Sequence, residues 1–302
     1  MKPTIVVIGS SNTDMVLKTQ RFPKPGETIL GGDFFMFQGG KGANQAVAAA
    51  RLGGDVTFIC KVGEDLFGDN AINHYAKENI NVSQILKAEN APSGVALITV
   101  NAEGENEIVV ASGANAMLSA KDVENAQDAL STAEYFLTQL ETPLATVEYL
   151  AKYAITHQKK LILNPAPAAT LPSSVYEGLF LITPNETEAE LLTGIEVKDE
   201  ETAKQAAETL QAKGVINIII TMGSKGAYVC AEDFKGMVET HKVNAVDTTA
   251  AGDVFNGALV VALSEDKDWK DAVAFACKAA AISVTKMGAQ SSAPYRNQID
   301  QQ

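Results

Sequence analysis

The sequence predicts an α/β protein in which helices flank a mostly parallel central sheet. From Arg51 onward, strand-sized apolar runs alternate with helical stretches, which is typical of parallel strands joined by helical crossovers. The 302 residues, of which 46% are hydrophobic, can bury a substantial core. Length alone allows one large domain or two smaller ones. In chain order the apolar runs are residues 5–8, 56–60, 136–140, 161–163, 179–182 and 216–221.

The first apolar run, residues 5–8, ends at a Gly9-Ser10 turn and superficially looks like the start of a dinucleotide-binding fold. The glycine pattern that would support this is absent. Gly9 is not followed by glycines at Gly-x-Gly-x-x-Gly spacing, and no Walker A pattern occurs because Lys41 precedes Gly42. The sequence therefore disfavours both of those nucleotide-binding folds.

Asn12 and Asp14 follow this first run, at the carboxyl end where α/β sheets gather ligands. An amide and a carboxylate together suit vicinal hydroxyl groups, because each hydroxyl both donates and accepts a hydrogen bond. The same residue types after a strand also make ordinary local turns. The residues alone leave both interpretations open.

Two regions break the alternation and are predicted to be antiparallel strands. They are residues 27–38 and residues 95–110, the latter with a turn at 101–105. The Phe-Phe-Met-Phe run at residues 34–37 is unusually apolar for a peripheral strand, so substrate, the main domain or another subunit must cover it. The alternative is a well-packed edge of the main sheet.

A glycine-rich turn, Gly-Gly-Lys-Gly-Ala-Asn at residues 39–44, opens a predicted helix that runs to Leu52 and is closed by Gly53-Gly54. Small residues at a helix start let its backbone approach a ligand or an anion closely. Lys41 adds a positive charge that can face a transferred phosphate, although a solvated lysine is the common alternative.

The most informative stretch is Asp-Thr-Thr-Ala-Ala-Gly-Asp at residues 247–253, which precedes an amphipathic run typical of a helix. Asp253 falls in the first turn of that helix. The small residues Ala250, Ala251 and Gly252 leave the backbone N–H groups open to an anionic oxygen. An ionised aspartate beside an anion site can deprotonate an alcohol during phosphoryl transfer. A capped helix after a tight turn is the alternative.

Two later turns fit either a nucleotide or a purely structural role. Asn185 and Glu188 open a helix that ends at Gly194, and their spacing is that of a capping-box variant. Residues 221–226 separate two strand-like runs. Their glycines permit close backbone approach, but a hairpin turn uses the same residues.

Composition excludes several functions. A net charge of −13 argues against nucleic acid or an anionic membrane surface as partner, and no apolar run is long enough to span a bilayer. The odd, isolated cysteines fit reduced thiols in a core, and the scattered histidines form no catalytic triad or zinc motif. These residues are Cys60, Cys230 and Cys277, and His74, His157 and His241.

The turns at residues 39–44 and 247–253 resemble the two signatures of the ribokinase family of sugar kinases, and they stand in the same order. The resemblance covers essentially the whole chain, and residues 12–14, 25–28 and 288–290 are similar to members that phosphorylate ribose. It implies a ribokinase-like three-layer sandwich with a small antiparallel β lid. We expect one domain over residues 1–302, with lid segments at approximately 15–38 and 93–111.

By resemblance, the protein is expected to be a cytoplasmic, ATP-dependent sugar kinase, with D-ribose the expected substrate. The implied catalytic residues are Asp253 as general base and Ala250, Ala251 and Gly252 as the anion turn. The implied sugar-binding residues are Asn12, Asp14, Gly40, Lys41, Asn44, Glu141 and Asp253. The implied nucleotide-binding residues are Asn185, Thr221, Gly223, Ser224, Lys225, Gly226, Gly252 and Cys277.

The resemblance also implies Mg²⁺ with ATP, K⁺ as an activator and a homodimer formed through the lid. Glu188 is expected to act on Mg²⁺ indirectly, since Mg²⁺ retains several waters. The implied monovalent-cation residues are Asp247, Thr249, Ser283, Lys286, Gly288 and Ser292. Alternatives are a fructokinase, nucleoside kinase or sugar-phosphate kinase of the same family, a non-catalytic sugar-binding regulator on this scaffold, or, more remotely, a nicotinamide oxidoreductase.

Overall fold

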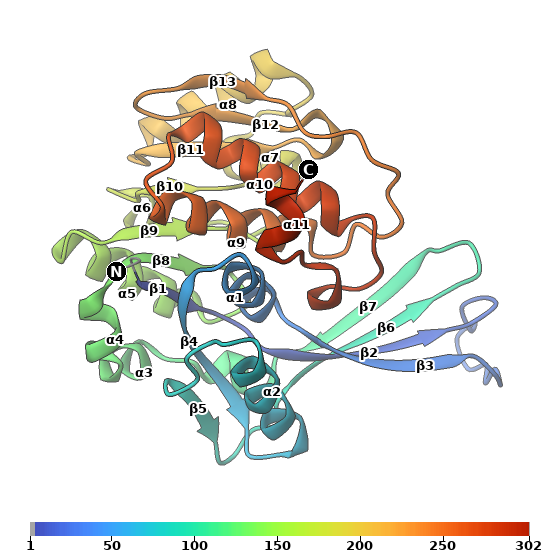
Figure 1. The fold of residues 1–302 in the computed structure, drawn as a ribbon. Coiled ribbons are helices and arrows are strands. Elements are labelled where there is room, and N and C mark those ends of the chain that lie inside the picture. Colours follow the sequence, from blue (N-terminus) through green and yellow to red (C-terminus); the bar gives the residue numbers. More distant parts are fainter. Residues whose placement is uncertain (1–3, 302) are drawn as a thin grey trace.

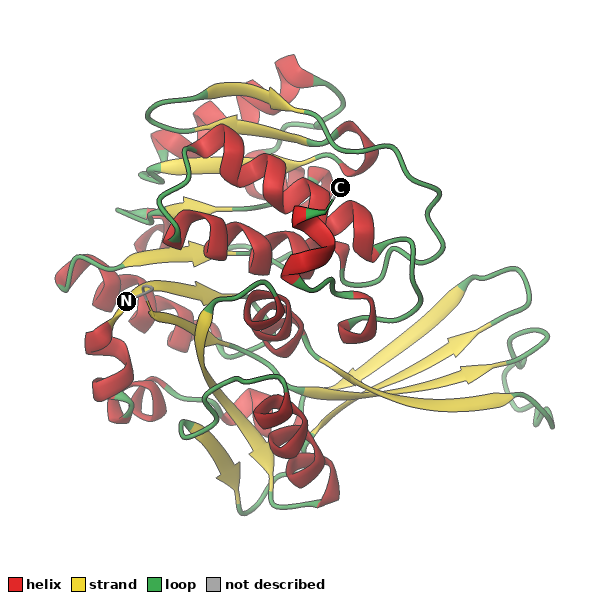
Figure 2. Ribbon diagram, viewed as in Figure 1, coloured by secondary structure: helices red, strands yellow, loops and turns green. Residues whose placement is uncertain are grey.

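The computed structural model describes residues 4–301, in which strands and helices alternate as predicted (Figure 1, Figure 2). Within this range the main sheet has nine strands. Seven pair in parallel from β11 to β5, and a hairpin of β12 and β13 extends one edge in antiparallel fashion. In spatial order the strands are β13 (Lys235–Val238), β12 (Ala227–Cys230), β11 (Asn217–Thr221), β10 (Leu181–Ile182), β9 (Lys160–Leu163), β8 (Ala133–Thr138), β1 (Thr4–Ile8), β4 (Asp55–Gly63) and β5 (Ile85–Ala88).

Helices cover both faces of this sheet, which confirms the predicted three layers (Figure 1). Successive residues of β1 are buried on opposite faces, Ile5 and Val7 on one and Val6 and Ile8 on the other. The first face is covered by α1 (Lys41–Arg51), α2 (Leu66–Lys77), α9 (Ala251–Ser264), α10 (Trp269–Ser283) and α11 (Arg296–Asp300). The second is covered by α3 (Ala120–Asn125), α4 (Gln127–Thr132), α5 (Leu144–Thr156), α6 (Ser173–Tyr176), α7 (Glu186–Thr193) and α8 (Glu200–Ala212).

A second, four-stranded sheet projects from the main body (Figure 1). Its order is β3 (Asp33–Gly39), β2 (Asn12–Lys18), β6 (Gly94–Val100) and β7 (Asn106–Ala111). The two outer pairs are antiparallel, as predicted, whereas the central pair of β2 and β6 is parallel. These strands form a sheet of their own, so the alternative of an edge of the main sheet is wrong.

Three predicted boundaries differ from the structure. The strand expected to begin at residue 27 begins at Asp33, because Gly31 and Gly32 adopt positive φ angles of 105° and 116° that end an extended strand. Asn12 and Asp14 belong to β2 rather than to a loop or local turn, since the chain enters the second sheet directly after Ser11. The run expected at 136–140 is β8, which ends at Thr138.

The remaining short elements are turns of 3₁₀ helix. They are η1 (Gly113–Met117), η2 (Gly223–Lys225) and η3 (Gln290–Ser292). Over residues 4–301, no helix combines the length and the apolar character needed to cross a bilayer. Cys60, Cys230 and Cys277 are free and buried, as the sequence predicts.

Candidate active site

The predicted anion turn lies at the start of α9. Ala250, which precedes the helix, adopts a left-handed conformation with φ of 59°, and in the described chain no side chain caps this helix start. A non-glycine residue at positive φ is strained, and such strain concentrates at functional sites. Apart from its two chain neighbours and the nearby backbone of its own helix, a Cβ at Gly252 would meet no described atom within 4 Å. The Ala251 backbone N–H donates to Thr248 O at 3.2 Å, so the open approach for an anionic oxygen at this helix start is at Gly252.

Asp253 lies in the first turn of α9 with only 5% of its surface exposed. Its Oδ2 accepts a hydrogen bond of 3.0 Å from Asn44 Nδ2, and its Oδ1 accepts one of 2.9 Å from Gln45 Nε2. Burial raises the pKa of Asp253, while Lys41 and the two amide donors oppose that rise. The fold thus joins the two glycine-rich turns, which are about 200 residues apart in the sequence.

Glu141 is held against the start of α1. Its Oε2 accepts hydrogen bonds from Ser10 Oγ at 2.5 Å and from the backbone N–H of Lys41 at 3.0 Å. A carboxylate in this position satisfies a helix N–H and complements the helix dipole. Gly40 precedes the helix at φ of 88°, where a Cβ would come within 2.8 Å of the Asn12 backbone nitrogen.

Asp14 pairs with Phe37 on the neighbouring strand β3, and its side chain reaches Gly39, where an added Cβ would fall 2.2 Å from an Asp14 carboxylate oxygen. Burial raises the pKa of Asp14 to about 7, and the negative charges of Glu141 and Asp253 add to the effect. Asp14, Glu141 and Asp253 therefore form one cluster of carboxylates at the junction of the two sheets.

Two amides complete this polar pocket. Asn12 Oδ1 accepts a hydrogen bond of 2.7 Å from Asn115 Nδ2, which fixes its orientation. Asn44 Oδ1 is buried and has no hydrogen-bond partner among the described residues. An unpaired buried acceptor is costly unless a ligand satisfies it, so this oxygen fits the hydroxyl group of a sugar.

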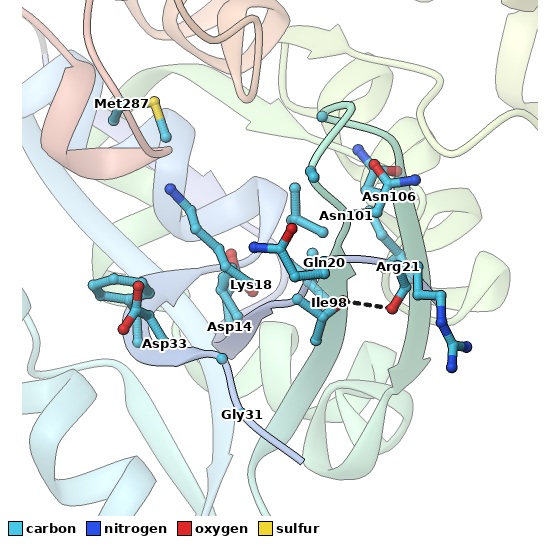
Figure 3. Close-up of a pocket in the computed structure, with 18 of the residues that line it drawn as sticks. Asp14, Lys18, Gln20, Arg21, Gly31, Asp33, Ile98, Asn101, Asn106 and Met287 are labelled. Atoms are coloured by element: carbon cyan, nitrogen blue, oxygen red, sulfur yellow. Dashed lines mark hydrogen bonds between the residues drawn. The ribbon is translucent and has the colours of Figure 1, made fainter. Parts of the chain in front are cut away.

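A cleft of about 1310 Å³ separates the second sheet from the C-terminal segments 246–249 and 287–289. Figure 3 shows Asp14, Lys18 and Asp33 on the second sheet, with Met287 across the cleft from them. Asp14 lines this cleft, whereas the more deeply buried Asp253 does not. The cleft is thus a route to the carboxylate cluster for a small polar ligand.

The predicted nucleotide residues meet at the carboxyl ends of β10 and β11. Asn185 forms an isolated parallel bridge with Thr221, and the Thr221 backbone N–H donates 2.9 Å to Pro184 O. Asn185 and Glu188 form the capping box that the sequence predicts for α7. The rest of the predicted loop, η2, is exposed at Gly223, Ser224 and Lys225, while Gly226 is buried.

Glu188 and Cys277 have different surroundings. Glu188 is buried, and burial raises its pKa while its backbone bond at Asn185 and the charge of Lys41 oppose the shift. Its capping bond uses only Oε2, so the other carboxylate oxygen fits an indirect, water-mediated contact with Mg²⁺. Cys277 lies on the buried face of α10, in the hydrophobic core, and burial raises its thiol pKa to about 12.

The predicted cation residues come from two segments that Asp247 holds together. Its Oδ1 accepts 2.9 Å from the Thr249 backbone N–H, and its Oδ2 accepts 2.8 Å from the Gly288 backbone N–H. Burial alone would raise the pKa of Asp247, but these hydrogen bonds hold it below its usual value. Ser283 and Ser292 donate their hydroxyls to backbone oxygens of their own turns, at Ala280 and Ala289, and the Lys286 backbone N–H donates to Ser283 O.

Several polar residues around the site were not predicted from the sequence. Gln45 contacts Asp253 directly, Ser10 holds Glu141, and Asn115 holds Asn12. For Gln45 a signal existed, because it lies beside Asn44 in a helix otherwise made largely of alanine and glycine. A polar pair on such a buried helix indicates a polar partner in the core. The other two carried no distinguishing pattern.

Comparison with known proteins identifies the family of this chain. A model described as pfkB family carbohydrate kinase matches residues 2–296. The chain is 46% identical over 298 residues to a ribokinase of Haemophilus influenzae, covering 99% of this chain and 97% of that protein. It is 41% identical over 298 residues to a deoxyribokinase of Salmonella typhi, and this match covers 98% of this chain and 97% of that protein.

A solved structure agrees with these relatives. The structure of Arabidopsis thaliana ribokinase complexed with ribose and ATP matches with a TM-score of 0.92 at 30% identity, and the match covers 100% of this chain and 98% of that one. Because the family model spans nearly the whole chain and the relatives match it end to end, this protein belongs to the pfkB family of carbohydrate kinases.

Proposed function

We propose that the protein transfers the γ-phosphoryl group of ATP to the 5-hydroxyl of D-ribose, with Asp253 as the general base. The observation that carries this proposal is the position of Asp253, a buried carboxylate in the first turn of an uncapped helix, bonded to Asn44 of the glycine-rich turn. A ribokinase at 46% identity and a ribokinase solved with ribose and ATP support the choice of reaction and substrate.

In this mechanism Asp253 accepts the proton of the sugar hydroxyl as the phosphoryl group is transferred. The transition state of phosphoryl transfer is loose, so the proton can move late and the carboxylate mainly positions the alcohol. The turn at residues 250–252 and the N-terminus of α9 stabilise negative charge on the transferred group. Mg²⁺, when bound with ATP, neutralises charge on the phosphate oxygens, and Glu188 is the residue suited to hold it through water.

The carboxylate cluster supplies the sugar site. Asn12, Asp14, Gly40, Lys41, Asn44 and Glu141 are proposed to bind the hydroxyl groups of the sugar. The unpaired Asn44 Oδ1 supports this assignment, since a hydroxyl group there would satisfy a buried acceptor. Neighbouring carboxylates suit a neutral polyol better than a phosphorylated sugar, which would need extra cationic contacts.

The nucleotide is proposed to lie over Asn185 and the turn at 221–226, with its phosphates directed to residue 252. The bridge between Asn185 and Thr221 supports a common surface for these elements. Because the thiol of Cys277 lies in the core, we propose that Cys277 supports the nucleotide site indirectly, as part of the helix α10 that borders it.

Potassium is proposed as an activator beside the anion turn. Asp247 already links residues 247–249 to Gly288, and its two carboxylate oxygens engage one backbone N–H each. The fit is mixed, because the Ser283 carbonyl also accepts an N–H, from Lys286. Thr249, Ser283, Lys286, Gly288 and Ser292 would contribute mainly backbone carbonyl oxygens.

The second sheet is proposed to act as a lid on a single cytoplasmic domain and to form a homodimer interface. The lid segments expected at about 15–38 and 93–111 correspond to strands β2, β3, β6 and β7, and residues 1–3 and 302 of the expected domain lie outside the described residues. Both faces of this sheet carry exposed apolar side chains. A bound sugar and the main domain can cover only the face that lines the cleft, so a second subunit is proposed to cover the other face.

A second substrate is favoured by one specific comparison. The deoxyribokinase of Salmonella typhi is 41% identical, close to the 46% of the Haemophilus influenzae ribokinase, so 2-deoxyribose competes with ribose as the substrate. These sugars differ by one hydroxyl. A site built to bind that hydroxyl would reject the deoxy sugar strongly, since its buried polar partners would be left unpaired.

A coupled assay of ATP consumption over ribose, 2-deoxyribose, fructose and a nucleoside tests the proposal. We expect the highest kcat/KM with ribose, and formation of the 5-phosphate by phosphorus NMR. A higher kcat/KM with 2-deoxyribose would transfer the assignment to the deoxy sugar. Absence of ATP turnover with every sugar would contradict the proposal and favour the alternative of a non-catalytic sugar-binding regulator.

A further inference from the structure

Gln45 lies directly behind Asp253 and has no role in the reaction described so far. Its side chain is fully buried in α1. Its Nε2 donates to Asp253 Oδ1 at 2.9 Å and to Asn164 Oδ1 at 3.0 Å, and its Oε1 accepts from Gln139 Nε2 at 2.6 Å. All three partners are protein groups, whereas Asn44 Oδ1 has no hydrogen-bond partner among the described residues.

These bonds fix the orientation of the Gln45 amide. An amide nitrogen carries two hydrogens, and both are used, by Asp253 and by Asn164. A flipped amide would place Oε1 against two acceptor oxygens and Nε2 against the donor nitrogen of Gln139. Because an ionised carboxylate only accepts hydrogen bonds, a charged Asp253 is compatible with one orientation of Gln45.

The same network returns to the helix that carries Asp253. Asn164 Nδ2 donates to Thr183 O at 3.4 Å, and Thr183 Oγ1 donates to Asn256 Oδ1 at 2.7 Å. Asn256 Nδ2 donates to the backbone oxygen of Gly252 at 2.8 Å. One continuous set of buried polar groups thus contacts the carboxylate at one end and the backbone of the anion turn at the other.

We infer that Gln45 is a positioning residue that fixes the rotation of the Asp253 carboxylate relative to the anion turn. The inference rests on the proposed role of Asp253 as general base. Asn44 shares its hydrogen bonds with the substrate, whereas Gln45 holds the base whether or not a sugar is bound. Without Gln45 the carboxylate can rotate about its side-chain bonds, and the distance from its oxygen to the alcohol varies.

The test replaces Gln45 by methionine, which keeps the length of the side chain and removes its donors. We expect Gln45→Met to lower kcat by roughly 10- to 100-fold, the usual effect of a misplaced catalytic group. KM for ribose and for ATP should stay within about twofold, because neither ligand touches this residue. Gln45→Asn, which keeps the amide but is one methylene shorter, should fold and lose rate in the same way.

Gln139→Met is the matched control. It removes an equally buried amide from the same network, bonded to Gln45 but not to Asp253, so it should destabilise the fold to a similar extent and change kcat only a few-fold. Thermal unfolding of each variant establishes that the assays use folded protein.

A double-mutant cycle separates positioning from general destabilisation. If Gln45 acts through Asp253, then Gln45→Met should cost little further rate once Asp253 is asparagine. Equal losses in the wild-type and Asp253→Asn backgrounds would overturn the inference, as would an unchanged kcat for Gln45→Met and Gln45→Asn. Full activity of Asp253→Asn would instead refute the assignment of the base, whatever Gln45 does.

Discussion

Asp253 and Asp14 belong to one carboxylate cluster, but the protein treats their charges differently. Asp253 receives two amide donors, which stabilise its ionised form against the cost of burial. Burial is the largest influence on the pKa of both residues, and at Asp14 the charges of Glu141 and Asp253 act in the same direction as burial. The site therefore suits a ligand that brings hydroxyl donors to these oxygens.

Asp253→Asn keeps the size and polarity of the side chain but cannot take a proton. We expect kcat to fall by roughly 10²–10⁴, the usual contribution of general base catalysis, while sugar binding persists. Single-turnover phosphoryl transfer and a separate sugar-binding titration measure the two effects. A loss below about tenfold would remove Asp253 from this role.

Asp14→Asn should stabilise the sugar-free protein in a pH-dependent way. Because the pKa of Asp14 is raised to about 7, the folded state holds this proton more tightly than the unfolded state does. Ionisation therefore lowers the free energy of unfolding as pH rises from about 4 to 7, and the full cost is present above pH 7. We expect Asp14→Asn to gain roughly 1–3 kcal/mol at pH 8 and much less at pH 5.

Urea denaturation at both pH values measures this difference, and Asp33→Asn, an exposed aspartate on the same sheet, is the control. An equal gain at pH 5 and pH 8 would contradict the assignment. The KM for sugar should rise in Asp14→Asn, since the variant loses a carboxylate acceptor for hydroxyl groups.

The chemistry of the two turns could be predicted because small residues beside a carboxylate have few other uses. Asn164 and Asn256 could not be predicted in the same way, and the signal at Gln45, a polar residue on a buried helix, does not identify its partner. Their partners are far away in the sequence, and an amide side chain shows nothing of its partner until the chain is folded.

At the scale of elements, the strands and helices around the site were predicted better than their ends. The second sheet followed from its apolar runs, but β3 starts six residues later than expected because two glycines at positive φ precede it. The parallel pairing of β2 with β6 joins segments on either side of α1, β4, α2 and β5. Local sequence patterns carry no information on such a long-range pairing.

Asp247 is the element-scale link, since it joins the segment before α9 to the segment after α10. If a potassium ion binds beside it, K⁺ should raise kcat more than it changes KM, because the ion would order the anion turn without touching the nucleotide. Activity is compared in K⁺ and in a bulky organic cation at equal ionic strength. Equal rates in both salts, with Asp247→Ala fully active, would return Asp247 to a structural role.

At the scale of the whole molecule, the second sheet is apolar on both faces. Phe35 and Phe37 line the cleft, while Phe34 and Met36 alternate with them and point to the opposite face. The three-layer core was predictable because its apolar runs and helices alternate in order. That the second sheet is apolar on both faces was indicated in the sequence only by the run of four apolar residues at 34–37.

Met36→Glu should weaken the proposed homodimer, because it places a charge in the outer face of the sheet, where Met36 is 57% exposed. Light scattering coupled to size-exclusion chromatography should show a dimer for the wild type and a shift toward monomer for the variant. Leu66→Glu is the control, since Leu66 is 71% exposed on α2, outside this sheet. A monomeric wild type, or an equal effect of both variants, would refute the lid interface.

The bond between Asn44 and Asp253 spans 209 residues of sequence, and this separation has a consequence for biosynthesis. During translation the glycine-rich turn of α1 is synthesised long before α9. A growing chain therefore contains proposed sugar-binding residues but not yet the general base Asp253. Contacts of such high sequence separation form slowly, after the local helices. Catalytic competence must therefore appear abruptly near the end of translation, and stalled chains that end before α9 emerges should show no phosphoryl transfer.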